Sequence, residues 1–150
     1  MTSIAHGLTG AFIATKLPSP FLYVPVIFAS HYLEDWIPHW DVGTGLSSGK
    51  RKRSTAIILE LFDLAITFGL VYLFWGYGQS DLSVFWLACI GAFVGLLPDF
   101  MEAPRNFLKW EPAFLKPFNE FHGMFHHSTP NKIVGILPQV VVIAVIWWLK

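Results

Sequence analysis

Histidine and aspartate residues recur at helical spacing in this 150-residue sequence. His31 and Asp35 are four positions apart, and so are His122 and His126. Side chains at this spacing project from one face of an α-helix, about one turn apart, so that a single helix can offer two ligands to one metal ion. The two pairs therefore predict metal-binding helices. Glu34 lies about 100° around the helix from Asp35, and we expect it to face lipid headgroups.

Glu60 and Asp63 form an acidic pair within a strongly apolar stretch. Residues three positions apart also share a helix face, and Thr67 continues this polar stripe. One of the two carboxylates could act as general base for a metal-activated water, which makes both residues candidate catalytic groups. They could instead pair with the neighbouring basic loop or with the positive end of the helix dipole.

The composition is typical of an integral membrane protein. Hydrophobic residues make up 54% of the chain and charged residues only 13%, against about 25% charged residues in average globular proteins. Ten Lys and Arg balance ten Asp and Glu, so the chain lacks the basic excess of proteins that bind nucleic acid. A single cysteine, Cys89, excludes an intrachain disulfide. We therefore expect membrane lipids, and no nucleic acid, as partners.

Three apolar stretches are candidate membrane spans. Ile57–Trp75 has nineteen residues, which at about 1.5 Å per residue nearly cross a hydrocarbon core of about 30 Å. Val84–Leu97 is wholly apolar but has only fourteen residues, so we expect a short span in a locally thinned bilayer. Ile133–Leu149 is apolar apart from Gln139 and ends near two tryptophans, which are typical of a membrane interface.

The remaining sequence predicts shorter helices. Ser3–Lys16 and Phe21–Trp36 read as two further membrane-embedded helices, separated by the prolines of residues 17–20. Prolines also divide residues 104–132 into short helices. We therefore predict an all-α polytopic membrane bundle of about five or six helices, folded as a single domain over residues 1–150.

Basic residues are distributed unevenly between the connecting segments. Residues 50–53 are four consecutive bases and residues 104–132 contain four more, whereas residues 76–81 contain none. Because Lys and Arg near span ends stay in the cytoplasm, we expect the first two segments inside and the third outside, in the cytoplasmic (inner) membrane. No basic stretch precedes the first apolar region, so we do not expect a signal peptide.

On this topology the ionisable residues gather toward one membrane face. All six histidines and nine of the ten acidic residues fall on the cytoplasmic side, and ionisable groups at membrane depth commonly mark a functional site. Imidazole and carboxylate ligands suit zinc first, with manganese or iron as alternatives. The candidates outnumber the ligands of one tetrahedral ion, so either two metals share them or some orient the others. The candidate metal ligands are His6, His31, Asp35, His39, Asp99, His122, His126 and His127.

Four short motifs resemble those of the YdjM-like inner-membrane metal-dependent hydrolase family. They are an N-terminal His6, SHYLED at 30–35, GLLPDF at 95–100 and HGMFHHS at 122–128. The resemblance implies a membrane-bound metal-dependent hydrolase. Within the motifs it nominates His6, His31, Asp35, Asp99, His122 and His127, with Ser128 in the terminal Ser position.

The motifs depart from the family pattern in three ways. SHYLED precedes GLLPDF here, whereas the family has its SHxxxD helix after the histidine motif. Met101 stands where the family has a second Asp, with Glu102 one place later, and Gly123 stands where the family has Arg. Glu102 could preserve a ligand, while the missing Arg removes a two-pronged donor for phosphate or carboxylate.

Metal-dependent hydrolysis of a phosphoester or other ester of a lipid is the function that we expect, with the site opening at headgroup depth on the cytoplasmic side. Three alternatives remain. A metal or proton transporter would use Glu60, Asp63 and the histidines as a relay, but residues 68–75 offer no further ionisable group toward the outer face. Paired histidines could also ligate a b-type haem. The polar cluster could finally belong to a non-enzymatic membrane protein.

Overall fold

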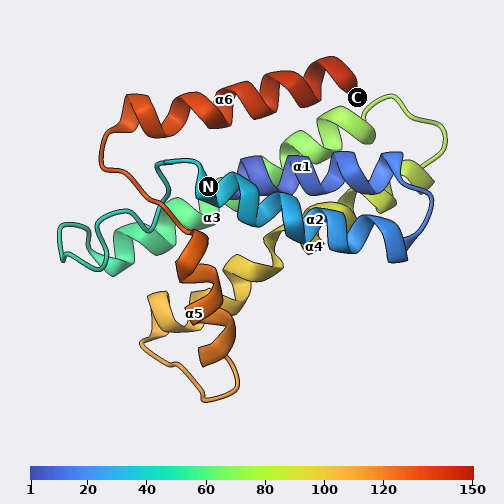
Figure 1. The fold of residues 1–150 in the computed structure, drawn as a ribbon. Helices are drawn as coiled ribbons and strands as arrows, with labels where there is room; N and C mark the ends of the chain where they lie inside the picture. The colour runs from blue at the N-terminus through green and yellow to red at the C-terminus, as the bar shows by residue number, and fades with distance from the viewer.

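The regular structure of the chain is helical. The computed structural model describes residues 1–150, and an isolated backbone bridge between His39 and Ser128 is its only strand-like feature (Figure 1). The predicted all-α fold class is confirmed. The elements are α1 (Ser3–Lys16), α2 (Pro20–Trp36), α3 (Arg53–Trp75), α4 (Ser83–Ala103), the π-helical turn η1 (Pro104–Leu108), α5 (Lys116–Phe125) and α6 (Lys132–Leu149).

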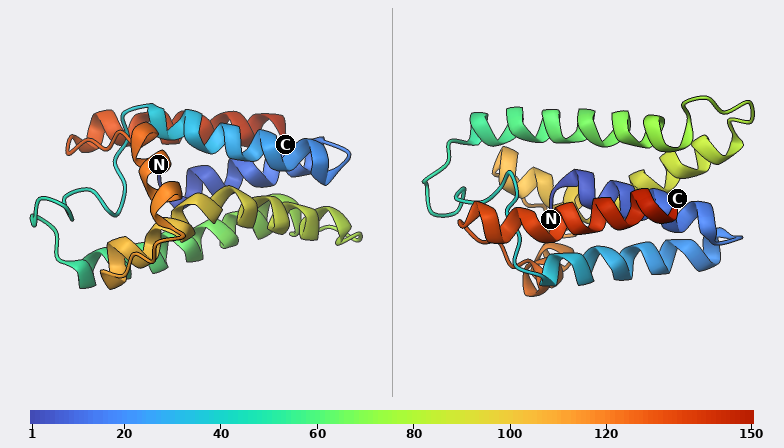
Figure 2. Two further views of the ribbon diagram at one scale, coloured as in Figure 1. Left: turned by 60° about the horizontal axis from the view of Figure 1, so that its bottom comes forward. Right: turned by 90° about the horizontal axis from the view of Figure 1, so that it is seen from above.

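Helix α1 lies in the middle of the bundle and packs against α2, α3, α4 and α6 (Figure 2). Small and apolar residues make this position possible, because Ala5, Leu8 and Ala11 have no exposed surface. The same helix carries His6 inward. The side chain of His6 is therefore shielded from solvent by the surrounding helices.

Glycines bring α1 and α4 into backbone contact. A Cβ atom added to Gly91 would meet the carbonyl oxygen of Gly10, and one added to Gly95 would meet the carbonyl oxygen of His6. Small residues four apart let two membrane helices approach closely, as the Gly91 and Gly95 pair does here. This approach places the C-terminal half of α4 beside the residues that begin α1.

Three helices are long and apolar enough to cross a membrane: α3 with 23 residues, α4 continued through η1 as Ser83–Leu108 with 26, and α6 with 18. The prediction of a short second span ending at Leu97 is wrong. Helix α4 continues past Leu97 to Ala103, with Pro98 inside it. This proline removes one backbone hydrogen bond but does not end the helix. Asp99 is thereby held on the same rigid helix as the apolar stretch.

The outer faces of these helices are apolar. Phe62 on α3 and Trp148 on α6 are exposed. In the most apolar 18-residue stretch of each of these two helices, only 17% is buried inside the protein. Exposed apolar faces of this extent require a hydrocarbon environment, so the chain has the character of an integral membrane protein.

An apolar core holds the inner faces together and consists of Leu8, Ala11, Val71, Trp75, Ala88, Ala92 and Ile146.

The two ends of the bundle differ. The loop after α2, the loop after η1 and helix α5 lie toward the end at which α1 begins, while the 17–20 turn and the loop between α3 and α4 lie at the opposite end (Figures 1 and 2). The predicted break at 17–20 and the predicted short helix within 104–132 are both present. The end that carries α5 also carries the histidines.

Candidate metal centre

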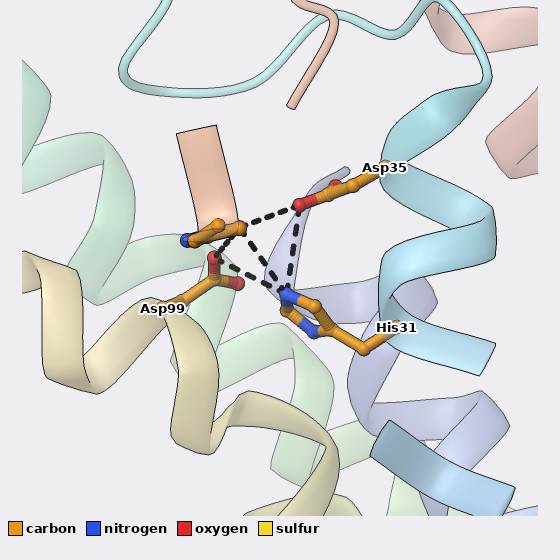
Figure 3. A group of neighbouring side chains, drawn as sticks. His31, Asp35 and Asp99 are labelled. Atoms are coloured by element: carbon orange, nitrogen blue, oxygen red, sulfur yellow. Dashed lines mark hydrogen bonds and ion pairs between the residues drawn. The ribbon is translucent and has the colours of Figure 1, made fainter. Parts of the chain in front are cut away.

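Four side chains from three helices meet beside the start of α1. His31 and Asp35 project from α2 and Asp99 projects from α4 toward them (Figure 3), and His122 of α5 completes the group. The His31 Nε2 atom lies 3.4 Å from His122 Nε2 and 3.5 Å from Asp35 Oδ2. His122 Nε2 lies 2.8 Å from Asp35 Oδ2, and Asp99 Oδ1 lies 3.8 Å from both Nε2 atoms. We call these four residues the first ligand set.

The spacing of the first ligand set is that of a tetrahedral metal site. Zinc–ligand bonds of about 2.0–2.1 Å at tetrahedral angles separate any two ligand atoms by about 3.3 Å. The five distances given above run from 2.8 to 3.8 Å and bracket this value, and all four ligand atoms lie within 4.8 Å of one another. Small side-chain rotations would therefore suffice to bind one ion.

The tautomer of His31 also suits a metal ligand. Its Nδ1 atom lies 2.8 Å from the carbonyl oxygen of Gly95, to which it can only donate a hydrogen bond. The proton is then on Nδ1, and the lone pair of Nε2 points into the ligand set. Backbone carbonyls commonly orient metal-binding histidines in this way. Packing of α2 against α4 brings this carbonyl within reach of His31.

Glu102 lies behind the imidazole of His122. The His122 Nδ1 atom lies 3.6 Å from Glu102 Oε2 and has no hydrogen bond of its own, although the side chain is almost fully buried. A carboxylate behind the imidazole is a frequent support for a metal ligand. Glu102 also contacts Arg105, so its charge is balanced on the other side.

His6 contacts the first ligand set from the side. Its ring stacks on the ring of His31 at a centroid distance of 3.9 Å, and its Nε2 atom lies 3.1 Å from Asp35 Oδ1. The amino group of Met1 contacts the same Asp35 oxygen. His6, predicted as a ligand, thus lies where it can hold Asp35 in position.

Glu34 is buried, and the expectation that it faces lipid headgroups is wrong. Only 8% of its surface is exposed, and its Oε2 atom lies 2.8 Å from His6 Nδ1. The hydroxyl of Thr9 also donates a hydrogen bond to Glu34. Helix α1 packs on this side of α2, which the sequence pattern of α2 alone does not reveal.

His39 and His126 form a second group around Asp35. Their Nε2 atoms are 3.3 Å apart, and His39 Nε2 lies 3.6 Å from Asp35 Oδ1. His122 and His126 thus belong to different groups despite their helical spacing. The reason is that α5 ends at Phe125, and the backbone of His126 is extended, with φ −76° and ψ 102°.

Asp41 belongs to the second group and was not among the predicted ligands. Its Oδ2 atom lies 3.3 Å from His39 Nε2 and 3.2 Å from His126 Nε2. Burial raises the pKa of the Asp41 carboxyl, but the contacts with His126 and His39 outweigh burial and hold this pKa well below its usual range. The sequence signal was the two-residue separation from His39, because alternate residues of an extended segment face the same side.

His127 lies outside both groups. Its side chain is exposed, and its Nδ1 atom, 2.7 Å from the carbonyl oxygen of Phe125, donates a hydrogen bond to it. The backbone of His127 nevertheless has a positioning role. Its carbonyl oxygen accepts a hydrogen bond from the His39 amide, and its own amide donates one to the Asp35 carbonyl.

Glu60 and Asp63 lie at the start of α1. The Asp63 carboxylate accepts hydrogen bonds from the backbone amides of Ser3 and Ile4, at 2.8 and 3.2 Å, and the Ser3 hydroxyl donates to Glu60 at 2.7 Å. Asp63 thus satisfies amides that a helix N-terminus leaves unpaired. The predicted catalytic pair is brought near the ligand groups, since both residues line the cavity described next.

A cavity of about 570 Å³ adjoins the two groups. Asp99 and His126 form part of its polar wall, together with Glu60. Its apolar wall comes mainly from α3, α4 and η1. The side chains of this wall include Ile57, Leu61, Leu64, Phe100, Phe107 and Leu108.

The chain matches none of the family models, curated proteins or solved structures with which it was compared.

Proposed function

We propose that this protein is a membrane-embedded, metal-dependent hydrolase that cleaves a phosphoester or other ester of a lipid at the cytoplasmic face of the inner membrane. The observation that carries the proposal is a buried four-residue ligand set that borders a cavity with one polar and one apolar wall. The likeness of four motifs to the YdjM-like hydrolases agrees with it, because every residue of the first ligand set lies in one of those motifs.

The ligand chemistry favours zinc, with manganese or iron as alternatives. Two imidazole nitrogens and two carboxylate oxygens are a common zinc donor set, and His31 already presents a free Nε2 lone pair. Such an ion supplies Lewis acidity and lowers the pKa of a water ligand toward about 7. Asp99 is the half-buried member of the set and lines the cavity, so substrate would approach from its side.

Glu60 is the better candidate of the acidic pair for proton transfer. Asp63 already accepts hydrogen bonds from the backbone amides of Ser3 and Ile4, and these amides would lose their partner if its carboxylate moved. Glu60 accepts a single hydrogen bond from Ser3, which leaves lone pairs free to take a proton from water in the cavity. We therefore assign the general base to Glu60 and a positioning role to Asp63.

The cavity favours a lipid substrate. Leu61 and Leu108 line it and are also exposed on the apolar outer surface, so the cavity reaches the surface that faces hydrocarbon. An acyl chain could lie between α3 and η1 while the ester group faces Asp99. Arg105 lies in the same wall and would attract an anionic headgroup.

The assignment to the cytoplasmic face follows from the basic residues. The loop between α2 and α3 ends in four consecutive bases and lies at the end of the bundle that carries the ligand sets (Figure 1). Its Gly43–Ser47 part contributes to the wall of the cavity. The positive-inside tendency would place this end in the cytoplasm.

The first test is the metal content of detergent-purified protein by elemental mass spectrometry. We expect stoichiometric zinc, manganese or iron in the wild type and loss of the ion held by the first ligand set in the double variant His31→Gln, His122→Gln. His127→Gln is the matched control, because it removes an exposed histidine outside both groups. Folded wild-type protein that takes up no metal on titration would refute the proposal.

The second test is hydrolysis of chromogenic phosphoesters and carboxylic esters, and of phospholipids in mixed micelles. A Glu60→Gln variant is expected to keep its metal and to lose about 100-fold or more in kcat, the usual range for a general base. Glu120→Gln, on the exposed face of α5, is the control. Metal-loaded wild type without activity on any of these substrates would favour a metal-handling protein instead.

A further inference from the structure

The second group has the geometry of a metal site in its own right. His39, Asp41 and His126 place three ligand atoms 3.2 to 3.3 Å from one another, close to the separation of about 3.3 Å expected on a tetrahedral zinc ion. The Oδ1 atom of Asp35 lies 3.6 Å from His39 Nε2, and Asp35, His39 and His126 offer ligand atoms within 4.8 Å of one another. We call these four residues the second ligand set.

Asp35 divides its two carboxylate oxygens between the two sets. Its Oδ2 atom faces His31 and His122, while its Oδ1 atom faces His39. A carboxylate has lone pairs on both oxygens and can bind a separate ion with each. Asp35 has no exposed surface, so both oxygens are directed into the protein.

His39 Nε2 and Asp41 Oδ2 have no partner outside the second set. His39 Nδ1, 2.9 Å from the carbonyl oxygen of Ile37, donates a hydrogen bond to it, so the Nε2 lone pair points into the set. Asp41 Oδ2 is buried and makes no hydrogen bond of acceptable geometry, despite the two imidazole nitrogens beside it. A buried carboxylate oxygen without a hydrogen bond is costly unless a cation neutralises it.

Backbone hydrogen bonds hold the second set together. The His39 amide donates to the His127 carbonyl at 3.1 Å, and the Thr129 amide donates to the His39 carbonyl at 2.7 Å. These bonds join the segment after α2 to the segment after α5, which carries His126. The amino group of Met1 contacts Asp35 Oδ1, so this oxygen already accommodates a positive charge.

We propose that the second ligand set binds a second divalent metal ion and that Asp35 bridges the two ions. What the second ion implies for the substrate rests on the proposed hydrolase function. In such enzymes, paired ions about 3.5–4 Å apart stabilise the attacking and leaving oxygens of an in-line displacement at phosphorus. A bridged pair therefore narrows the substrate class from esters in general to phosphoesters, including phosphate-containing lipid headgroups.

The test is the number of metal ions that the full-length protein binds in detergent. After titration with Zn²⁺ and removal of free metal, we expect about two ions per chain in the wild type and in His127→Gln. The double variants His39→Gln, His126→Gln and His31→Gln, His122→Gln are each expected to keep about one. Asp35→Asn should weaken both sites, because each loses a charged ligand.

A measurement on the wild type tests the bridge even if the variants fail to fold. Protein loaded with Mn²⁺ should show the electron paramagnetic resonance spectrum of an exchange-coupled pair, which two ions on one bridging carboxylate produce. Variants that lack one set should show isolated Mn²⁺. An isolated-ion spectrum in the fully loaded wild type would overturn the bridge.

The outcomes separate this inference from the proposed function. One ion per chain that is lost in the His31, His122 variant, and retained in the His39, His126 variant, overturns the second site and leaves the proposed hydrolase intact. Two ions that persist in the His39, His126 variant also overturn the assignment. Wild type that binds no ion overturns both proposals.

Discussion

At the scale of single residues, the centre is organised around Asp35. The carboxylate contacts imidazoles of both ligand sets, and His6 and the Met1 amino group lie against its Oδ1 atom. Burying such a charge is tolerable only where cations or hydrogen-bond donors surround it. The buried histidines next to it therefore stabilise the fold at this end of the bundle, whether or not they bind a metal ion.

Metal binding is expected to depend on pH, because an imidazole must release its proton before it can bind an ion. Burial lowers the pKa of His126, but contact with Asp41 outweighs burial and raises this pKa above its usual value. Protons therefore compete with metal up to a higher pH than at an isolated histidine. Zinc affinity should fall by about tenfold or more between about pH 8 and about pH 6.

Competition titration with a zinc-sensitive fluorophore at several pH values would measure this dependence. The exposed His127→Gln variant should follow the wild type. An affinity that stays constant over the range would contradict the assignment of imidazole ligands.

At the scale of elements, Gly95 of α4 contacts both α1 and the first ligand set. Gly95 allows α1 to approach α4, and its carbonyl oxygen accepts a hydrogen bond from the Nδ1–H group of His31. One residue thus serves both the packing of two helices and the orientation of a candidate ligand. Gln139 of α6 makes a comparable link, since it donates to the Trp40 carbonyl and accepts from the Thr2 amide.

Substitution of Gly95 by Leu is expected to separate α1 from α4. The new side chain would meet the backbone of His6, so we expect a loss of about 1–3 kcal/mol in the free energy of unfolding and weaker metal binding. Gly69→Leu in α3 is the matched control, because a Cβ at Gly69 meets nothing within 4 Å. Thermal unfolding in detergent and zinc titration measure the two effects; equal behaviour of the two variants would refute the packing role.

At the scale of the whole molecule, polarity is segregated along the bundle. The exposed faces of α3, α4 and α6 are apolar. The ligand sets, the cavity and the basic loop belong to one end of the bundle, the end at which α1 begins. A hydrocarbon core excludes unpaired charges, so ionisable side chains concentrate where water and headgroups begin. This distribution suits a site that handles the polar part of a lipid.

The orientation of the bundle can be measured by cysteine labelling. In a Cys89→Ser background, Ser48→Cys in the basic loop should resist a membrane-impermeant maleimide in intact cells and react after permeabilisation, because positive loops stay in the cytoplasm. Ser80→Cys, in the base-free loop, should react in both conditions. The reverse pattern would move the site to the outer face.

The sequence by itself determined the fold class, the membrane character and the break at residues 17–20. These properties depend on composition and on local effects of proline, which act within a few residues. It also identified six of the seven residues in the first and second ligand sets, because histidine and carboxylate at membrane depth are rare enough to be noticed. Only Asp41 was missing from those predictions.

Only the tertiary structure decided which of these residues meet. His122 and His126 share a helical spacing but belong to different ligand sets, because α5 ends between them. Glu34 is buried because α1 packs over it. The side chain of His127 lies outside both ligand sets, while its backbone bonds to the backbones of Asp35 and His39. Helix crossings and backbone pairing between distant segments are non-local, and no spacing within a single helix encodes them.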